Sequence, residues 1–333
     1  MTTMTPTTTM TLSRALGEGL RKAMESDPKV MVMGEDVGKL GGVFRVTDGL
    51  QKDFGEARVV DTPLAESGIV GTAIGLALRG YRPVCEIQFD GFVYPAFDQI
   101  VSQLAHMRLR SLGTVSLPVV IRIPFGGGIG AVEHHSESPE ALFAHTPGLR
   151  VVACGDPADA YVMIQQAISS DDPVIFFEPK RRYWDKTDVD TAGGLASATP
   201  LHKARTLVSG TDVTVLAYGP MVRTCAEAAV AATADGRSLE VIDLRSLAPL
   251  DTETIVASVR RTGRCVVVHE AVSSGGLGAE IAARVTEECF YQLEAPVLRV
   301  CGYSTPYPPS RIEEHYLPDL DRVLDGVDRT FAY

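Results

Sequence analysis

The residue best placed to do chemistry in this sequence is Glu66, which stands where a buried strand gives way to an apolar helix. A β-branched run ends at Val60, and Pro63 stops it, because proline cannot continue a central strand. From Ser67 the pattern is helical, and the positions around the glutamate are small or apolar. A carboxylate in such surroundings is costly unless it has a partner or a task.

Two opposing effects set the ionisation of Glu66. Its place at a helix start favours the anion by about 0.3–2 kcal/mol. Burial disfavours the anion by up to about 3–5 pKa units. We expect burial to win, so that the carboxyl exchanges a proton with a bound group near neutral pH. The alternative is a glutamate that only satisfies backbone N–H groups at a helix end.

Two further segments could serve the same site. Gln88 and Phe92 follow a predicted strand and offer an amide and an aromatic face to a flat heterocycle, although aromatic residues at this density are usually core. Of the adjacent His134 and His135, one could move a proton at the mouth of a site, or both could be surface residues. Ligands of doubly wound sheets bind at the carboxyl ends of strands, so Glu66 and the Gln88 segment are predicted to share one crevice.

The elements that must position these residues alternate as strand and helix along the chain, which predicts an α/β protein of two doubly wound domains. Asp156-Pro157 is a strong helix start, and a longer helix is predicted over 95–110. The predicted parts are a mobile tail at 1–11, a first domain at 12–180, a charged linker at 181–200 and a second domain at 201–333. We assign no chemistry to the charged run KRRYWDK that opens the linker.

Composition excludes several classes of function. The chain has 333 residues and a formal net charge of −11, which argues against nucleic acid as a main partner. Its six cysteines form no C-x-x-C pair, which indicates reduced thiols in a cytoplasmic protein and no metal site. No segment is long and apolar enough to span a bilayer, and the N-terminus lacks the layout of a signal peptide.

Two glycine-rich turns, PFGGGIG and SSGGLGAE, raise the alternative of a nucleotide site. The second stands between a strand and a helix, as a dinucleotide fingerprint would, but the third glycine is missing. No G-K-S/T sequence occurs. We interpret both as tight turns, and keep a nucleotide- or flavin-binding electron-transfer subunit as the alternative function.

Seven segments together resemble the β subunit of the thiamine-dependent 2-oxo acid dehydrogenases, the decarboxylating first components of large dehydrogenase complexes. The likeness runs from about residue 12 to 317 and is most similar to the branched-chain (2-oxoisovalerate) type. The segments are GEDVGKLGGVFRVTDGL, DTPLAESGIVG, EIQFDGFVYPAFDQI, HHSESPEALFAHTPGLRVV, PVIFFEPK, EVIDLRSLAPLD and HEAVSSGGLGAEIA.

The resemblance implies a thiamine pyrimidine-binding, transketolase-like domain followed by a transketolase C-terminal-type domain. It implies an α2β2 heterotetramer with thiamine diphosphate between α and β, and docking to a dihydrolipoyl acyltransferase core and its lipoyl domain. The G-D-G…N motif that holds the diphosphate and Mg²⁺ is absent here. The chain is therefore expected to bind the pyrimidine half only, leaving the diphosphate and Mg²⁺ to the α subunit. Asp172 is a candidate ligand of a K⁺ ion, as in some relatives.

The motif T-P-L-x-E carries the family's catalytic glutamate, which implies that role for Glu66. It would share a proton with the far ring nitrogen of the aminopyrimidine and so favour the imino tautomer. The same motif implies that Leu64 touches the aminopyrimidine. Gln88 matches its polar neighbour, and Phe92 matches the ring that stacks on it, where relatives often carry Tyr.

The family's active-site histidine directly precedes a serine, which implies His135, with His134 as the alternative. The implied activity is oxidative decarboxylation of a branched-chain 2-oxo acid and reductive acylation of the lipoyl group. The β subunit of a pyruvate or acetoin dehydrogenase is an alternative. A scaffold that has lost its chemistry is another, although Glu66, Gln88 and His135 count against it.

Overall fold

A seven-stranded sheet forms the centre of the first domain in the computed structural model, which describes residues 7–333. The strand order is β12-β6-β7-β5-β4-β2-β3, and all neighbours are parallel except β12 and β6. The strands are β2 (Val30–Gly34), β3 (Val59–Asp61), β4 (Arg82–Glu86), β5 (Val120–Phe125), β6 (Arg150–Ala153), β7 (Val174–Pro179) and β12 (Ser246–Ala248). The near-continuous apolar character of β2, β5 and β7 reflects burial on both faces.

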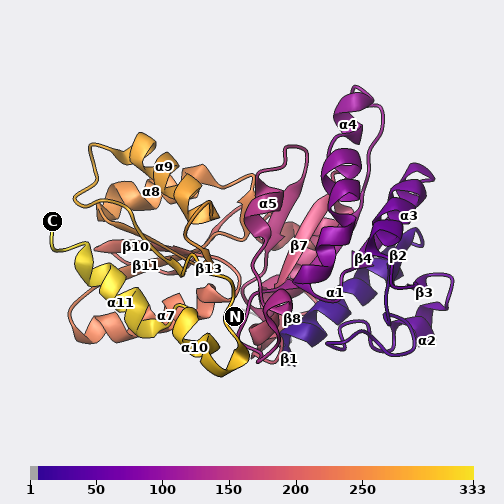
Figure 1. Ribbon diagram of the computed structural model, residues 1–333, viewed down its shortest axis with the longest axis horizontal. Helices are drawn as coiled ribbons and strands as arrows, with labels where there is room; N and C mark the ends of the chain where they lie inside the picture. The colour runs from indigo at the N-terminus through magenta and orange to yellow at the C-terminus, as the bar shows by residue number, and fades with distance from the viewer. Residues whose placement is uncertain (1–6) are drawn as a thin grey trace, which may run out of the picture.

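Helices cover both faces of this sheet, which confirms the doubly wound prediction (Figure 1). One face packs against α1 (Leu12–Ser26) and α6 (Pro157–Ser169). The other packs against α3 (Glu66–Leu78) and α5 (Glu140–Ala144). The predicted start of α6 is confirmed, since the side chain of Asp156 caps the helix and Pro157 takes its first position.

The prediction of one long helix over 95–110 is wrong. The chain forms a 3₁₀ segment (Asp90–Ala96), a π-helical segment (Gln99–Leu104) and the short helix α4 (Met107–Arg110). Pro95 lies inside the first of these, where its missing N–H and its ring disfavour a continuous α-helix. Irregular helix of this kind is frequent at functional sites.

The second domain is built on a five-stranded sheet with the order β14-β13-β10-β11-β9. Its strands are β9 (Arg205–Val208), β10 (Val213–Ala217), β11 (Leu239–Asp243), β13 (Cys265–Val272) and β14 (Leu298–Gly302). Helices α7 (Met221–Ala234) and α11 (Leu320–Arg329) cover one face, and α8 (Thr252–Thr262) and α9 (Leu277–Cys289) cover the other (Figure 1). Two short helices, α2 (Leu50–Phe54) and α10 (Glu313–Tyr316), lie outside these layers.

The predicted tail and linker each contain a strand, so residues 7–11 are ordered where a mobile tail was predicted. β1 (Thr7–Thr11) pairs in antiparallel register with β8 (Lys186–Asp190). The remainder of the predicted tail, residues 1–6, lies outside the described part. The first segment was predicted to be mobile because it is polar, and the second to be a linker because it is charged; the pairing joins residues that are far apart in sequence.

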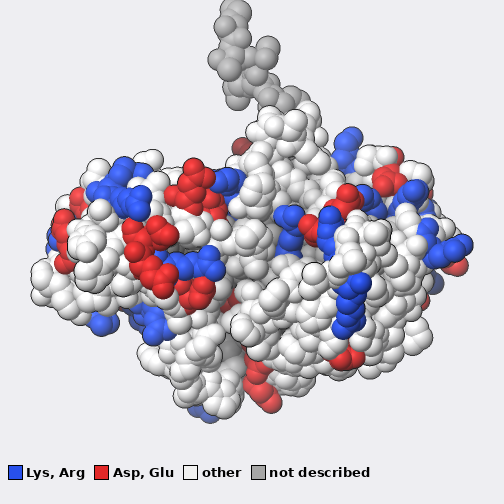
Figure 2. Space-filling view, turned by 90° about the horizontal axis from the view of Figure 1, so that it is seen from above, with Lys and Arg blue, Asp and Glu red and all other residues white. Residues whose placement is uncertain are grey.

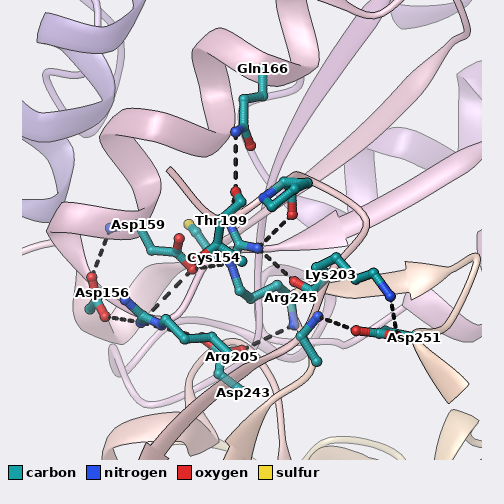
Figure 3. A network of polar contacts seen from close by, with 12 residues as sticks. Cys154, Asp156, Asp159, Gln166, Thr199, Lys203, Arg205, Asp243, Arg245 and Asp251 are labelled. Carbon is teal, nitrogen blue, oxygen red and sulfur yellow. Dashed lines mark hydrogen bonds and ion pairs between the residues drawn. The ribbon is translucent and has the colours of Figure 1, made fainter. Parts of the chain in front are cut away.

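The junction between the domains is held by strand pairing and by buried ions. β12 follows the second domain's β11 in sequence, yet it pairs with β6 of the first domain. Close by, the guanidinium of Arg245 donates to Asp159 at 2.7 Å and to the carbonyls of Pro200 and Lys203 at 2.8 and 2.6 Å (Figure 3). The domains are therefore joined by more than the connecting chain.

Candidate functional site

The carboxyl ends of five parallel strands gather polar side chains along one edge of the first sheet. Glu35 follows β2, Glu66 begins the helix after β3, and Gln88 follows β4. His135 lies in the loop after β5, and Lys180 follows β7. Parallel strands place their carboxyl ends on one edge, which is where doubly wound sheets bind ligands.

Glu66 is buried, as predicted, with 6% of its surface exposed. It is the first residue of α3, and Ala65 before it provides no side-chain cap. Within residues 7–333 no donor forms a hydrogen bond with its carboxylate, so the alternative of a helix-capping glutamate is not supported. Leu64, two residues earlier, is 74% exposed.

Glu35 is a second buried carboxyl at this edge, and the sequence analysis missed it. It is 9% exposed, and its Oε1 atom is buried without a hydrogen-bond partner among the described residues. Burial raises the pKa of Glu35, and the negative charges of Glu66 and Asp36 raise it further. The signal that could have found it is a carboxylate placed directly after the buried strand VMVMG.

Phe92 and His135 are in contact, and Gln88 follows β4 at the same edge of the sheet. The Nε2 atom of Gln88 donates to the carboxylate of Asp36 at 3.3 Å, and Asp36 directly follows Glu35 in the sequence. The ring of Phe92 meets the His135 ring edge-on, with centroids 4.8 Å apart. Phe89, between Gln88 and Phe92 in sequence, also packs against His135.

The two histidines have different surroundings. His135 is half-buried among aromatic rings, whereas His134 is exposed. Burial lowers the pKa of His135, and the nearby His134 and the cation of Lys180 lower it further. The hydrogen bond between the His135 ring and the His134 carbonyl and the charge of Glu133 oppose these effects. A neutral imidazole is therefore favoured at position 135 at neutral pH, which suits an acceptor or donor of protons.

The first glycine-rich turn is not a phosphate cradle, because its N–H groups are already bonded. Gly127 donates to Glu270 at 3.2 Å, and Gly128 and Gly130 donate to Glu313 at 3.1 and 2.8 Å. Both carboxylates belong to the second domain. The negative charges of the Glu270 and Glu313 carboxylates would repel a phosphate at these N–H groups.

The second glycine-rich turn closes around a histidine. A Cβ atom added at Gly278 would lie 2.5 Å from Nε2 of His269, and one at Gly276 would lie 2.4 Å from the carbonyl of Val272. The N–H of Gly278 donates to His269 at 3.2 Å. These glycines permit close packing within the domain, which removes the main support for a nucleotide site.

Asp172, the candidate K⁺ ligand, holds two arginines instead of facing an open site. Its carboxylate accepts from Arg108 and Arg150, both at 2.7 Å. Within residues 7–333 no cluster of three or more His, Cys, Asp and Glu residues is arranged to bind a metal ion. The K⁺ site stays a prediction, and Asp172 would have to release an arginine to contribute its carboxylate.

The outer face of α3 has no partner in the described chain. Ile69, Val70 and Ala73 are buried against the sheet, whereas Gly75 on the other side has nothing within 4 Å of an added Cβ. The only contact at Gly71 is with Gln99, at 3.4 Å. Small residues on this face would allow a neighbouring helix to pack closely, and no residue of the described chain lies against Gly75.

Three further features relate to the composition: membrane-spanning helices, the cysteines and the distribution of surface charge. No helix in the described chain is long and apolar enough to cross a membrane. The six cysteines are all buried and unpaired, as predicted. Figure 2 shows basic and acidic side chains interspersed on the displayed face, with no continuous basic surface there.

Comparison with known proteins gives consistent matches over nearly the whole chain. Residues 8–185 match the family "Transketolase, pyrimidine binding domain", and residues 202–323 match "Transketolase, C-terminal domain". A pyruvate dehydrogenase E1 component subunit beta from Leifsonia xyli is 63% identical, over 96% of this chain and 94% of that protein. A 3-methyl-2-oxobutanoate dehydrogenase subunit beta from Mycobacterium tuberculosis is 56% identical, over 97% and 92%. The solved structure "Split gene transketolase, inactive beta4 tetramer" has a TM-score of 0.78 and 25% identity, covering 97% of this chain and 98% of its own.

Proposed function

Since this chain belongs to the family of transketolase-like β subunits of thiamine-dependent 2-oxo acid dehydrogenases, we propose that it supplies the pyrimidine half of a thiamine diphosphate site shared with an α subunit. When bound, thiamine diphosphate supplies the carbanion that attacks a 2-oxo carbon and accepts the electrons left by CO₂. The residues of this chain bind and orient the pyrimidine and control its protonation.

The observation that carries the proposal is the unpartnered carboxylate of Glu66, buried to 6% exposure at a sheet edge. A carboxyl in that position can hold a proton against a ring nitrogen without competition from protein donors. Glu35 lies beside it, and its pKa is raised by burial and by the negative charge of Glu66. The donor set therefore fits an aminopyrimidine.

Gln88, Phe92 and His135 complete the pyrimidine side. The Gln88 amide would hydrogen-bond the ring, and the Phe92 ring would stack on it. Leu64 would contact the same ring, and its 74% exposure in the free chain supports a place in a site closed by another molecule. His135 would stabilise charge or move a proton as the acyl group leaves for the lipoyl arm.

The absence of a diphosphate motif in the sequence supports a requirement for the α subunit, which would hold the diphosphate and Mg²⁺. Asp156, in the one Gly-Asp pair followed by Pro, caps α6 and pairs with Arg205, so it is committed to structure. The uncharged outer face of α3 fits a helix of that partner in an α2β2 heterotetramer. The split-gene transketolase of similar fold is an inactive β4 tetramer, which supports the view that such a chain is inactive alone.

For the substrate we propose a branched-chain 2-oxo acid, with the acyl group passed to the lipoyl domain of a dihydrolipoyl acyltransferase. Pyruvate is the second candidate, favoured by the 63% identical relative. The deciding measurement is a panel of 3-methyl-2-oxobutanoate, 4-methyl-2-oxopentanoate, pyruvate and 2-oxoglutarate on the chain co-expressed with an α partner. The highest kcat/KM for pyruvate would overturn the branched-chain assignment.

The catalytic assignment is tested by Glu66→Gln in the same co-expressed complex. We expect decarboxylation to fall by several orders of magnitude with assembly preserved, because the amide cannot share a proton with the pyrimidine. Glu56→Gln is the matched control, since Glu56 is exposed and lies shortly before Glu66 in the sequence. Undiminished turnover in Glu66→Gln would remove the proposed role.

A further inference from the structure

Lys180, the first residue of the charged run KRRYWDK, is buried, although no chemistry was assigned to this run from the sequence. Lys180 is 1% exposed, and its Nζ forms an ion pair with Asp90, which is 0% exposed. Neither residue belongs to the proposed pyrimidine contacts. Burial of two charges carries a desolvation cost that only good geometry and further hydrogen bonds can offset.

The additional bonds all go to the loop that carries His135. The Nζ of Lys180 donates to the carbonyl oxygen of His135 at 2.5 Å. Asp90 Oδ2 accepts from the backbone N–H of Glu137 at 2.7 Å. The two members of the ion pair therefore hold backbone groups on both sides of Ser136.

A cavity borders the same loop. A cavity of about 220 Å³ lies there, lined by Ser136, Glu137 and Ser138 of the loop. Glu270 and Tyr307 of the second domain line its opposite wall. The bonds from Lys180 and Asp90 therefore contribute to the position of a loop that is not fully enclosed.

The same pair also acts on the ring that the histidine packs against. The Nζ of Lys180 lies 5.6 Å from the centroid of Phe89, and Phe89 is stacked on His135. Lys180 thus contacts both the backbone of His135 and the ring beneath its imidazole. Asp90 follows Phe89 directly in sequence, so displacement of Asp90 would move that ring as well.

We propose that the buried Lys180–Asp90 pair is a positioning device that sets the His135 imidazole at the cofactor site. This inference rests on the proposed function of His135. Lys180 and Asp90 are positioning residues, because neither is placed to touch substrate or cofactor. Their effect on the reaction passes through the place and the protonation of the imidazole.

The test is a double-mutant cycle in the assembled α–β complex, with reductive acylation of lipoyl domain as the readout. Lys180→Met keeps the side chain's length and removes its charge and donors. We expect kcat for acylation to fall by about 10- to 100-fold, as expected of a displaced catalytic group. In a His135→Ala background the same change should cost less than about twofold, because residues that act as one unit are not additive. Lys186→Met, at an exposed position in the same run, is the control.

The pH profile separates positioning from general damage. Removing the Lys180 cation should raise the pKa of His135, since that cation now lowers it. The other ionisable groups facing His135 are His134 and Glu133 on its own turn, and these are unchanged. The acid limb of kcat should therefore move to higher pH in Lys180→Met, but not in the control.

Asp90→Asn is the second variant, for use if Lys180→Met does not fold. Its amide oxygen can still accept from the N–H of Glu137, so we expect a smaller loss of kcat for acylation than in Lys180→Met. This loss should also disappear in the His135→Ala background. The inference would be overturned if the substitutions lowered kcat by the same factor with and without His135 and left the pH profile unchanged. Full acylation by His135→Ala alone would instead reject the proposed role of His135, and Glu66→Gln would still test the cofactor assignment separately.

Discussion

The imidazole of His135 lies flat on the ring of Phe89, with centroids 4.2 Å apart and planes inclined by 25°. The edge of Phe92 meets the same imidazole, so two aromatic rings from one segment hold it. His134 makes a more distant, tilted approach to Phe92, with centroids 6.4 Å apart, and remains exposed. This difference favours His135 as the histidine that serves the site.

The first prediction compares the two histidines directly. We expect His135→Ala to slow acyl transfer to lipoamide by about 10²- to 10⁴-fold, the usual contribution of a positioned acid or base. His134→Ala should change the rate of acyl transfer by less than about twofold, because substitutions of exposed side chains usually have small effects. Single-turnover acylation of the co-expressed complex measures both. The reverse ranking would show that His134 is the active residue.

The second prediction concerns the outer face of α3. Gly75→Leu should leave the chain folded, and even favour the helix by up to about 1 kcal/mol, since Leu is a better helix former than Gly. Nothing in the described chain lies within 4 Å of the added Cβ. A leucine there would hold a partner helix away, so association with the α subunit should weaken.

Size-exclusion chromatography of the co-expressed subunits, with thermal unfolding of the chain, measures this effect. Gly194→Leu is the matched control, because Gly194 also has nothing within 4 Å of an added Cβ and lies outside any helix face. Normal assembly of Gly75→Leu would mean that the α3 face is not the contact surface.

The third prediction is a pH dependence of stability at His269. Its Nε2 accepts from Gly278 and its Nδ1 lies 3.1 Å from the Ala271 carbonyl, so the neutral form is fixed. Burial lowers its pKa to about 4 from an ordinary value of 6.5. The unfolded chain therefore takes up a proton as pH falls below 6.5 while the folded chain does not, and about 3 kcal/mol of stability is lost by pH 4.

Denaturant unfolding of wild type and His269→Gln across pH 4–8 measures this contribution as a difference. Subtraction is needed because Glu140 and Asp243, whose pKa values burial raises to about 7 and about 8, change stability in the opposite direction. Parallel pH curves for the two proteins would contradict the assignment.

The fourth prediction concerns the domain junction. Arg245→Met should destabilise the chain by about 3–5 kcal/mol, because it leaves buried Asp159 and two carbonyls without their donor. Arg284→Met is the control, since the Arg284–Glu280 pair is similarly short at 2.6 Å but half exposed, and should cost less than about 1 kcal/mol. Equal losses for the two variants would show that the junction is not held by this buried pair.

Local sequence was sufficient to predict the alternating elements and the burial of Glu66. Strand periodicity, the Asp156-Pro157 cap and the stop at Pro63 are all properties of neighbours along the chain, and the structure has them where expected. The prediction of one long helix over 95–110 was wrong because Pro95 disfavours a continuous α-helix, and the chain forms 3₁₀ and π-helical segments there.

The sequence by itself therefore determined the doubly wound architecture and the burial of Glu66, since those follow from short-range patterns of apolar and polar residues. Only the tertiary structure decided which distant side chains meet. Lys180 is 90 positions from Asp90 in the sequence. Glu313 is far along the chain from Gly128, whose N–H group donates to its carboxylate. Such contacts depend on how the strands are ordered in the sheet, and no local pattern of residues encodes that order.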